Sequence, residues 1–168
     1  MLIQKAEINH YQFTKRFKAV AFDCDGTLRR SLNPRYPYPT AKHEWELMPN
    51  VPGVLQTYYT PVSDIRYAVI TNQSGIYTGT VSYAHARDMI TDLLPIFHNR
   101  NVDIYVCPHS VDAHCPCRKP SPYALLRFAM TRNIKLTELL YVGDMMSDFE
   151  SANTANVAFC WSTDFFGW

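Results

Sequence analysis

The chain has 168 residues, of which 47% are hydrophobic and 18% are charged. This length fits one domain of ordinary size, and the composition supports a packed core and argues against disorder. The net charge of +1 argues against a broad nucleic-acid-binding face, which normally needs many basic residues. It leaves room for local basic clusters such as Arg29, Arg30 and Arg35. No run approaches the roughly 20 apolar residues of a membrane span, and the first residues do not resemble a secretory signal, so we expect a cytoplasmic protein.

Short apolar runs, each closed by a polar or glycine-containing turn, predict buried parallel strands. In chain order, these strands are residues 18–22, 66–70, 102–106, 139–142 and 157–161. The helices predicted between them are residues 51–59, 81–97, 121–131 and 147–153. Asn50 and Ser121 are candidate caps of the first and third helices, and Pro95 should end or distort the second. Strands that alternate with helices predict an α/β fold with a central parallel sheet.

Polar residues directly follow three of these predicted strands. They are Asp23, Thr71 and Asp144. In an open α/β sheet, ligands bind outside the carboxyl ends of the strands. We therefore expect these residues, remote in sequence, to converge on one crevice.

Residues 22–28 read Phe-Asp-Cys-Asp-Gly-Thr-Leu. Two aspartates, Asp23 and Asp25, are separated by the single residue Cys24. Gly26 permits a tight turn with unusual backbone angles. The pair could simply end a strand in a polar turn, or it could belong to a calcium loop. A calcium loop of the EF-hand type would need a third ligand at Thr27, a distal glutamate at the end of the loop and flanking helices, whereas Leu28, Arg29 and Arg30 follow here.

Three further segments offer groups that suit a phosphate and a cation. Residues 71–75 provide a hydroxyl, two amides and loop N–H groups for phosphate oxygens, and residues 118–120 place an arginine and a lysine before a helix start, where an anion can bind. Residues 143–148 add two carboxylates, Asp144 and Asp148. Each segment alone also fits an ordinary turn, a solvated pair of charges or a helix cap.

In this order, the four motifs resemble those of the haloacid dehalogenase-like (HAD) hydrolases. The motifs are Asp-x-Asp-Gly-Thr, Thr-Asn, Lys and Gly-Asp-x-x-x-Asp, and they span Asp23 to Asp148. The resemblance implies a Rossmann-like three-layer α/β sandwich around a central parallel sheet. No insertion between the first two motifs is long enough for a large cap domain, so we expect residues 1–168 to form a single phosphatase domain with a relatively open site.

By this resemblance, Asp23 is a nucleophile that forms an aspartyl-phosphate. Asp25 is the acid/base that protonates the leaving oxygen and then activates water. Thr71 would hydrogen-bond the phosphoryl group, and Lys119 would pair with the phosphate and with Asp23. The implied reaction is the hydrolysis of a phosphomonoester.

The resemblance also implies a Mg²⁺ site. Asp144 would ligate the ion together with Asp23 and the backbone carbonyl of Asp25, while Asp148 would support it from the surrounding shell. Mg²⁺ prefers oxygen ligands and keeps several waters, so these groups suffice. The ion and Lys119 would offset the repulsion between an anionic nucleophile and an anionic phosphate.

A second metal site is predicted in the loop at residues 107–117. A Cys-x-His pair and a Cys-x-Cys pair can close four ligands around a tetrahedral Zn²⁺. The candidate ligands are Cys107, His109, Cys115 and Cys117. His114 is a competing ligand, and a loop with free thiols is the alternative. Because the protein supplies all four ligands, this zinc should be structural and should hold the loop that delivers Arg118 and Lys119.

This loop, continuous with Arg-Lys-Pro, resembles that of one HAD branch, the histidinol-phosphate and heptose bisphosphate phosphatases. The five-residue spacer between His109 and Cys115 is more similar to the histidinol phosphatases. By this resemblance, Asn72 and Arg118 would contact substrate or phosphate, and the substrate would be a small metabolite such as histidinol phosphate or a sugar phosphate. Cys24 stands where arginine is common in the branch, and we expect it to be a small buried residue.

Two alternatives remain at this point. A polynucleotide 3′-phosphatase shares the same core motifs, and Tyr36, Tyr38 and Trp45 could line a groove for a nucleic-acid end. A zinc-stabilised binding module without activity is the non-enzymatic alternative. It would be favoured by loss of the aspartates or Lys119, and all of them are present.

Overall fold

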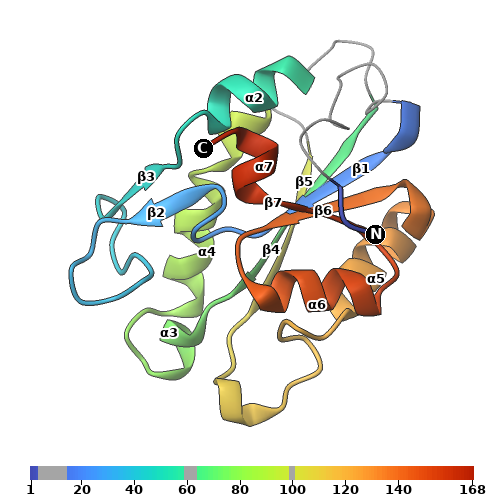
Figure 1. Cartoon of the computed structure of the whole chain (residues 1–168). Helices are drawn as coiled ribbons and strands as arrows, with labels where there is room; N and C mark the ends of the chain where they lie inside the picture. Colours follow the sequence, from blue (N-terminus) through green and yellow to red (C-terminus); the bar gives the residue numbers. More distant parts are fainter. Residues whose placement is uncertain (4–14, 59–63, 99–100) are drawn as a thin grey trace.

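The computed structural model describes residues 1–3, 15–58, 64–98 and 101–168. Its centre is a parallel sheet of five strands in the order β5-β4-β1-β6-β7 (Figure 1). The strands are β1 (Ala19–Phe22), β4 (Arg66–Asn72), β5 (Val102–Cys107), β6 (Leu139–Gly143) and β7 (Ala158–Trp161). All five predicted strands are therefore confirmed, with ends that differ by one or two residues.

The burial of the strands follows their place in the sheet. Every residue of β1 and β6 is buried, whereas the edge strand β5 is buried only at its last residue. Phe22 of β1 pairs with Val69 of β4 and with Val142 of β6. Because these three strands run parallel and in register, the residues at and just after their carboxyl ends meet at one edge of the sheet; Thr71, predicted to follow its strand, is the next-to-last residue of β4.

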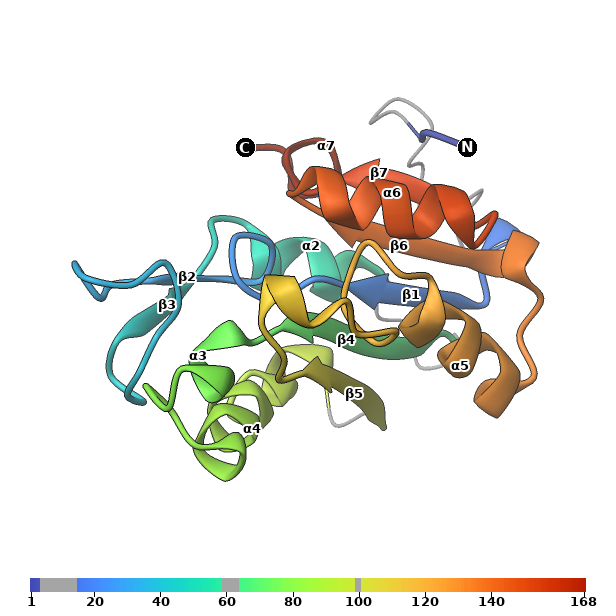
Figure 2. The ribbon, with the colours of Figure 1, turned by 90° about the horizontal axis from the view of Figure 1, so that it is seen from below.

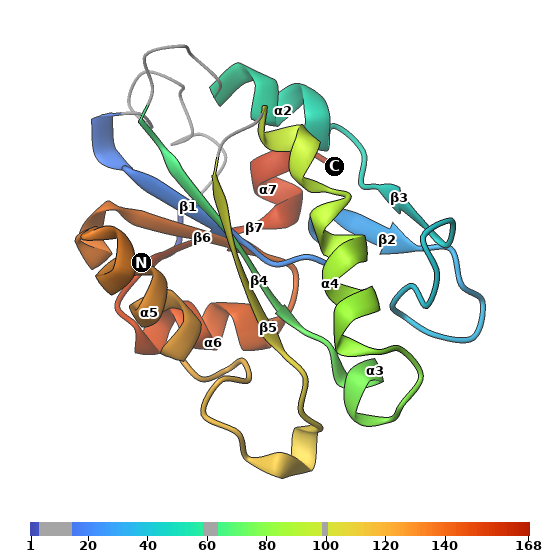
Figure 3. The same ribbon diagram turned by 180° about the vertical axis from the view of Figure 1, so that it is seen from behind.

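Helices cover both faces of the sheet and produce three layers (Figures 1 and 3). The core on one face includes residues of α2 (Val51–Tyr58), α4 (Tyr83–Thr91) and α7 (Ser162–Phe166). The core on the other face includes residues of α5 (Tyr123–Arg132) and α6 (Met146–Thr154). The predicted three-layer α/β fold is confirmed.

The helix predicted at 81–97 is two helices. The α-helix α4 ends at Thr91, and a short 3-10 helix, η2 (Leu94–Phe97), contains Pro95. Proline has no N–H and clashes with the preceding turn, so the predicted distortion at Pro95 is confirmed. Ser82, one residue before α4, caps it by accepting a hydrogen bond from the backbone N–H of His85.

The other predicted helices differ only at their ends. The predicted cap Ser121 is wrong by one position, since Pro122 precedes the first residue of α5 and makes no side-chain cap. Ser121 Oγ instead accepts from the backbone N–H of Tyr123 at 3.3 Å. The Asn50 amide donates to the Phe166 carbonyl at 3.3 Å, and the Asn50 backbone carbonyl accepts from the Val54 N–H at 2.9 Å at the start of α2. Residue 59 of the first predicted helix lies outside the described residues.

Several short helices were not predicted. They are α3 (Ser74–Tyr77), α7, η3 (Val111–Ala113) and η4 (Leu136–Glu138). Each is three to five residues long, too short for a periodic apolar pattern to be recognised. No helix in the described residues is long and apolar enough to cross a membrane.

A small hairpin lies beyond the sheet, formed by the antiparallel strands β2 (Arg29–Ser31) and β3 (Trp45–Leu47) (Figures 1 and 2). Its connecting loop is held by Glu44, whose carboxylate accepts hydrogen bonds from Thr40 and Asn33. These donors, Thr40 first, lower the pKa of Glu44 to about 2. Arg29 is completely buried, so the suggested basic surface cluster with Arg30 and Arg35 does not include it.

Candidate active site

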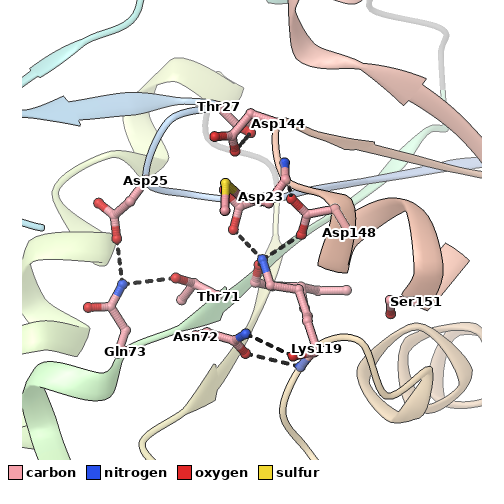
Figure 4. A network of polar contacts seen from close by, with 12 residues as sticks. Asp23, Asp25, Thr27, Thr71, Asn72, Gln73, Lys119, Asp144, Asp148 and Ser151 are labelled. Atoms are coloured by element: carbon pink, nitrogen blue, oxygen red, sulfur yellow. Dashed lines mark hydrogen bonds and ion pairs between the residues drawn. The ribbon is translucent and has the colours of Figure 1, made fainter. Parts of the chain in front are cut away.

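Three carboxylates gather at the carboxyl edge of the sheet (Figure 4). Asp23 follows β1, Asp144 follows β6, and Asp148 lies in the first turn of α6. One oxygen atom from each can be chosen so that all lie within 4.8 Å of one another. Carboxylate oxygens at this spacing are the donor set that a hard divalent cation such as Mg²⁺ prefers, so the residues present fit the ion.

Lys119 reaches this group from the loop before α5. Its Nζ donates to Asp23 Oδ1, to Asp148 Oδ1 at 2.7 Å and to the Ile70 carbonyl at 3.2 Å. Burial works to lower the pKa of Lys119, but the charges of Asp23 and Asp148 more than offset it and raise the pKa overall. The ammonium group is therefore a fixed positive charge beside Asp23.

Asp23 is buried, and this environment disfavours its charged form. Burial raises its pKa well above the ordinary value, the charge of Lys119 lowers it, and the charges of Asp148 and Asp144 raise it further. The pKa of Asp144 is raised in the same direction, first by burial. A cation bound among these carboxylates would favour the ionised form of Asp23, which is the form that can act as a nucleophile.

Asp144 and Asp148 are each held in place by their neighbours. Thr27 Oγ1 donates to Asp144 Oδ1 at 2.9 Å. Tyr141 Oη donates to Asp148 Oδ1 at 2.8 Å, and the Met145 backbone N–H donates to Asp148 Oδ2 at 3.0 Å. Asp148 is thus engaged by several protein donors, which suits a supporting position better than direct metal ligation.

The carboxylate of Asp25 lies outside the group of three. Arg29 Nε donates to its Oδ1 at 2.7 Å, and Gln73 Nε2 donates to its Oδ2 at 2.6 Å. The same Gln73 nitrogen lies 2.8 Å from Thr71 Oγ1 and can donate to it. Gln73 therefore connects the residue predicted to bind phosphate with the predicted acid/base (Figure 4).

The two predicted substrate contacts have protein partners in the structure. Asn72 exchanges two hydrogen bonds with the backbone of Lys119, at 3.1 and 3.2 Å, and so fixes the loop that carries the lysine. Arg118 Nη1 donates to the His109 carbonyl at 2.9 Å. Asn72, which belongs to β4, therefore holds the loop at residues 107–119 against the sheet, whereas the contact of Arg118 lies within the loop.

The four predicted zinc ligands come together. One donor atom from each of Cys107, His109, Cys115 and Cys117 lies within 4.8 Å of the others. His109 Nδ1 is 3.6 Å from Cys107 Sγ and 3.5 Å from Cys117 Sγ. His114 is exposed and does not belong to this group among the described residues. Three thiols and an imidazole form the donor set of a tetrahedral Zn²⁺ site.

Sequence reasoning missed the roles of Arg29, Gln73 and Tyr141. Gln73 stood inside a segment already singled out for phosphate, but its contact with Asp25 could not be read from spacing. Arg29 follows Asp25 by four residues and was assigned only to a basic cluster. Cys24 is fully buried, and burial raises the pKa of its thiol well above the ordinary value, as expected for a small buried residue.

A cavity of about 570 Å³ opens from the carboxylates toward the hairpin. Asp25 and Asp144 line it, together with Arg30, Arg35 and Tyr36. Tyr36, one of the aromatic residues considered for a groove, therefore lies at the cavity wall. Its ring stacks on that of Tyr38, with ring centroids 5.5 Å apart. A volume of this size is typical of sites for small molecules.

The parallel sheet and the residues gathered at its carboxyl edge define a HAD-like phosphatase. A family model described as polynucleotide kinase 3 phosphatase matches residues 18–166. This is most of the chain, and the chain therefore belongs to that family of phosphatases.

Individual relatives place the chain more closely. A D-glycero-beta-D-manno-heptose-1,7-bisphosphate 7-phosphatase from Photorhabdus laumondii is 30% identical, with 86% of this chain and 79% of the relative covered. The enzyme of the same name from Escherichia coli is 32% identical, with 85% and 77% covered. The chain is a HAD phosphatase of the heptose bisphosphate phosphatase branch, whereas the five-residue spacer had favoured the histidinol phosphatases of the same branch.

A solved structure agrees in fold. The D,D-heptose 1,7-bisphosphate phosphatase of B. bronchiseptica, complexed with magnesium and phosphate, superposes with a TM-score of 0.70 at 26% identity. The match covers 85% of this chain and 79% of that chain.

Proposed function

We propose that the chain hydrolyses the phosphomonoester of a small sugar phosphate, with Asp23 as nucleophile and Asp25 as acid/base. One observation carries the proposal: Asp23 pairs with Lys119 and lies within 4.8 Å of two further carboxylates at the carboxyl edge of the sheet. This arrangement combines an anionic nucleophile with the charges needed to neutralise a phosphate.

The proposed reaction has two halves. Asp23 attacks phosphorus, the bond from phosphorus to the leaving oxygen breaks, and Asp25 gives that oxygen a proton. Asp25 then takes a proton from water, whose oxygen attacks the aspartyl-phosphate and releases Asp23 and inorganic phosphate. Thr71 and Lys119 hydrogen-bond the transferring group throughout.

In this proposal Asp23, Asp144 and the backbone carbonyl of Asp25 hold Mg²⁺, and Asp148 supports the site. When bound, Mg²⁺ offsets negative charge on the carboxylates and on the phosphate oxygens. Cys107, His109, Cys115 and Cys117 would hold a structural Zn²⁺, which keeps the loop before Lys119 in place.

Two features support a sugar phosphate as the substrate. The relatives at 30% identity or more are named as phosphatases of a heptose bisphosphate. The cavity beside Asp25 has the volume of a small-molecule site and carries Arg30 and Arg35, whose guanidinium groups suit hydroxyls and anionic groups. In this proposal Asn72 and Arg118 also contact the substrate or its phosphate, in addition to their hydrogen bonds with the Lys119 backbone and the His109 carbonyl.

A polynucleotide 3′-phosphatase is the second candidate, because the matching family model carries that description. Nucleic-acid binding depends steeply on salt when basic residues neutralise several phosphates. The net charge of +1 favours the small substrate.

The test is phosphate release from a panel of phosphomonoesters, with and without Mg²⁺, by the wild type and Asp23→Asn. The panel contains a heptose bisphosphate, other sugar phosphates, histidinol phosphate, nucleotides and a 3′-phosphorylated oligonucleotide. We expect Mg²⁺-dependent release from a sugar phosphate and a loss of at least about 1,000-fold in Asp23→Asn, since covalent catalysis has no substitute nucleophile there. Full activity of a metal-replete Asp23→Asn would contradict the mechanism, and a preference for the oligonucleotide would favour the second candidate.

A further inference from the structure

Arg29 is a fully buried arginine at the start of β2, four residues after Asp25. A buried guanidinium is costly unless its N–H groups meet acceptors. Nη1 of Arg29 donates to the Met89 carbonyl of α4 at 3.1 Å, whereas Nη2 has no hydrogen-bond partner in the described residues, and the guanidinium lies 5.8 Å from the centre of the Trp45 ring. With the group anchored by α4 and β3, Nε donates to Asp25 Oδ1 at 2.7 Å.

Gln73 holds the other oxygen of the same carboxylate. It is 2% exposed, and its Nε2 lies 2.6 Å from Asp25 Oδ2 and 2.8 Å from Thr71 Oγ1 (Figure 4). Its backbone N–H donates to the Cys107 carbonyl at 2.8 Å, which ties it to the end of β5. Both oxygens of Asp25 are therefore held by buried donors whose own positions are fixed by other elements.

We propose that Arg29 and Gln73 are positioning residues, which together hold Asp25 in the orientation needed for proton exchange with the leaving oxygen and with water. The inference rests on the proposed function, because it requires Asp25 to be the acid/base. Each carboxyl oxygen has two lone pairs, so one donor on each oxygen still leaves a site for the transferred proton. The proton passes from Asp25 to the leaving oxygen as its bond to phosphorus breaks, and water later returns a proton to Asp25.

The expected size of the effect follows from the role of the acid. General acid–base catalysis contributes about 100- to 10,000-fold, and a catalytic group displaced by about 1 Å can lose about 100-fold. Removing one of two anchors should therefore cost roughly 10- to 100-fold on a substrate that needs the proton.

The test compares kcat/KM for two substrates that differ in their need for the acid. One is the sugar phosphate that the panel shows to be hydrolysed fastest; its leaving group is a sugar alkoxide, which leaves poorly without a proton. The other is p-nitrophenyl phosphate, whose leaving group needs little protonation. In Arg29→Met and in Gln73→Leu we expect a loss of about 10- to 100-fold on the sugar phosphate and under about threefold on the aryl phosphate. Arg29→Lys should recover part of the loss. Equal losses on both substrates would overturn the inference, since a general structural defect affects both.

A double variant tests whether the anchors act through Asp25. In the Asp25→Asn background, Arg29→Met should cost no further activity on the sugar phosphate, whereas additive losses would contradict the inference. Arg132→Met is the matched control, because Arg132 pairs with Asp103 at 2.6 Å on α5 and β5 and should leave the substrate ratio unchanged. If thermal unfolding shows that Arg29→Met does not fold, Gln73→Leu carries the test.

The same experiment separates the inference from the proposed function. Equal losses on both substrates in Asp25→Asn would remove the acid/base role itself, and the inference with it. A selective loss in Asp25→Asn that neither anchor variant reproduces would leave the proposed function intact and overturn only the positioning role.

Discussion

Gly26 lies in the turn after β1 with a positive φ of 98°, directly against Asp144. A Cβ atom at this position would lie 2.3 Å from Asp144 Oδ2, closer than any real contact, and a left-handed backbone costs about 1–2 kcal/mol for other residues. The turn therefore needs glycine for its backbone and for the room that it leaves to a proposed metal ligand. At Gly143 the requirement is steric only, because a Cβ there would lie 2.5 Å from Asp148 Cβ.

We predict that Gly26→Ala displaces Asp144 and weakens Mg²⁺ activation. The Mg²⁺ concentration for half-maximal activity should rise about tenfold or more, because removal or displacement of one ligand or its support typically costs 10- to 100-fold in affinity. The measurement is a Mg²⁺ titration of phosphate release. Gly53→Ala is the matched control, since no atom lies within 4 Å of its added Cβ; an unchanged Mg²⁺ response in Gly26→Ala would refute the steric argument.

At the scale of elements, the loop from β5 to α5 carries both the cysteine group and Lys119. Its only regular structure is η3, three residues long, so the backbone alone gives the loop little stability. A metal bound by Cys107, His109, Cys115 and Cys117 would supply that stability. The hydrogen bonds of Arg118 with His109 and of Asn72 with the Lys119 backbone would then keep Lys119 in position.

We predict that Cys117→Ser removes the bound zinc, lowers the thermal midpoint by roughly 5–10 °C and reduces phosphate release. Metal binding contributes directly to folding free energy, and 1 kcal/mol corresponds to about 2–4 °C in a chain of this size. Metal analysis and thermal unfolding provide the measurement. His114→Ala should retain the zinc, because that histidine lies outside the ligand group, and a zinc-free wild type would contradict the prediction.

At the scale of the whole molecule, the aromatic core lies directly behind the site. Phe22, the residue before Asp23, contacts four aromatic rings from β4, η2 and α7, with centroids 5.6–6.4 Å away. This cluster lies under one face of the sheet and an alanine-rich cluster under the other. Both clusters contain residues of the strands that end at the site. The packing of the core therefore fixes the positions of the site residues at the ends of these strands.

We predict that Phe22→Ala lowers the free energy of unfolding by about 3–5 kcal/mol, the usual cost of removing a buried phenylalanine. Urea unfolding at constant Mg²⁺ measures this loss. Leu126→Ala on α5 is the control, because Leu126 is 41% exposed and surface substitutions change stability by only about 0.5 kcal/mol. A loss for Phe22→Ala no larger than for Leu126→Ala would show that the aromatic cluster contributes little.

Sequence patterns alone predict the five strands, the order of the four motifs and the sets of carboxylate and cysteine residues. These features are local: an apolar run, a short spacing or a turn residue can be read without knowing what lies beside it. The helix ends at Ser121 and Pro95 were less exact, because they depend on single hydrogen bonds and on the geometry of proline.

The convergence of Asp23, Thr71 and Asp144 is expected from a parallel sheet, and the register of β1, β4 and β6 produces it. The way in which Asp25 is held could be found only in the folded structure. The burial of Arg29 and its contacts with Met89 and Trp45 depend on how α4 and β3 pack. Spacing along the chain carries no information on such long-range contacts, because they arise from the packing of elements and not from the neighbours of each residue. The anchoring of Asp25 by Arg29 and Gln73 is therefore a property of the folded molecule.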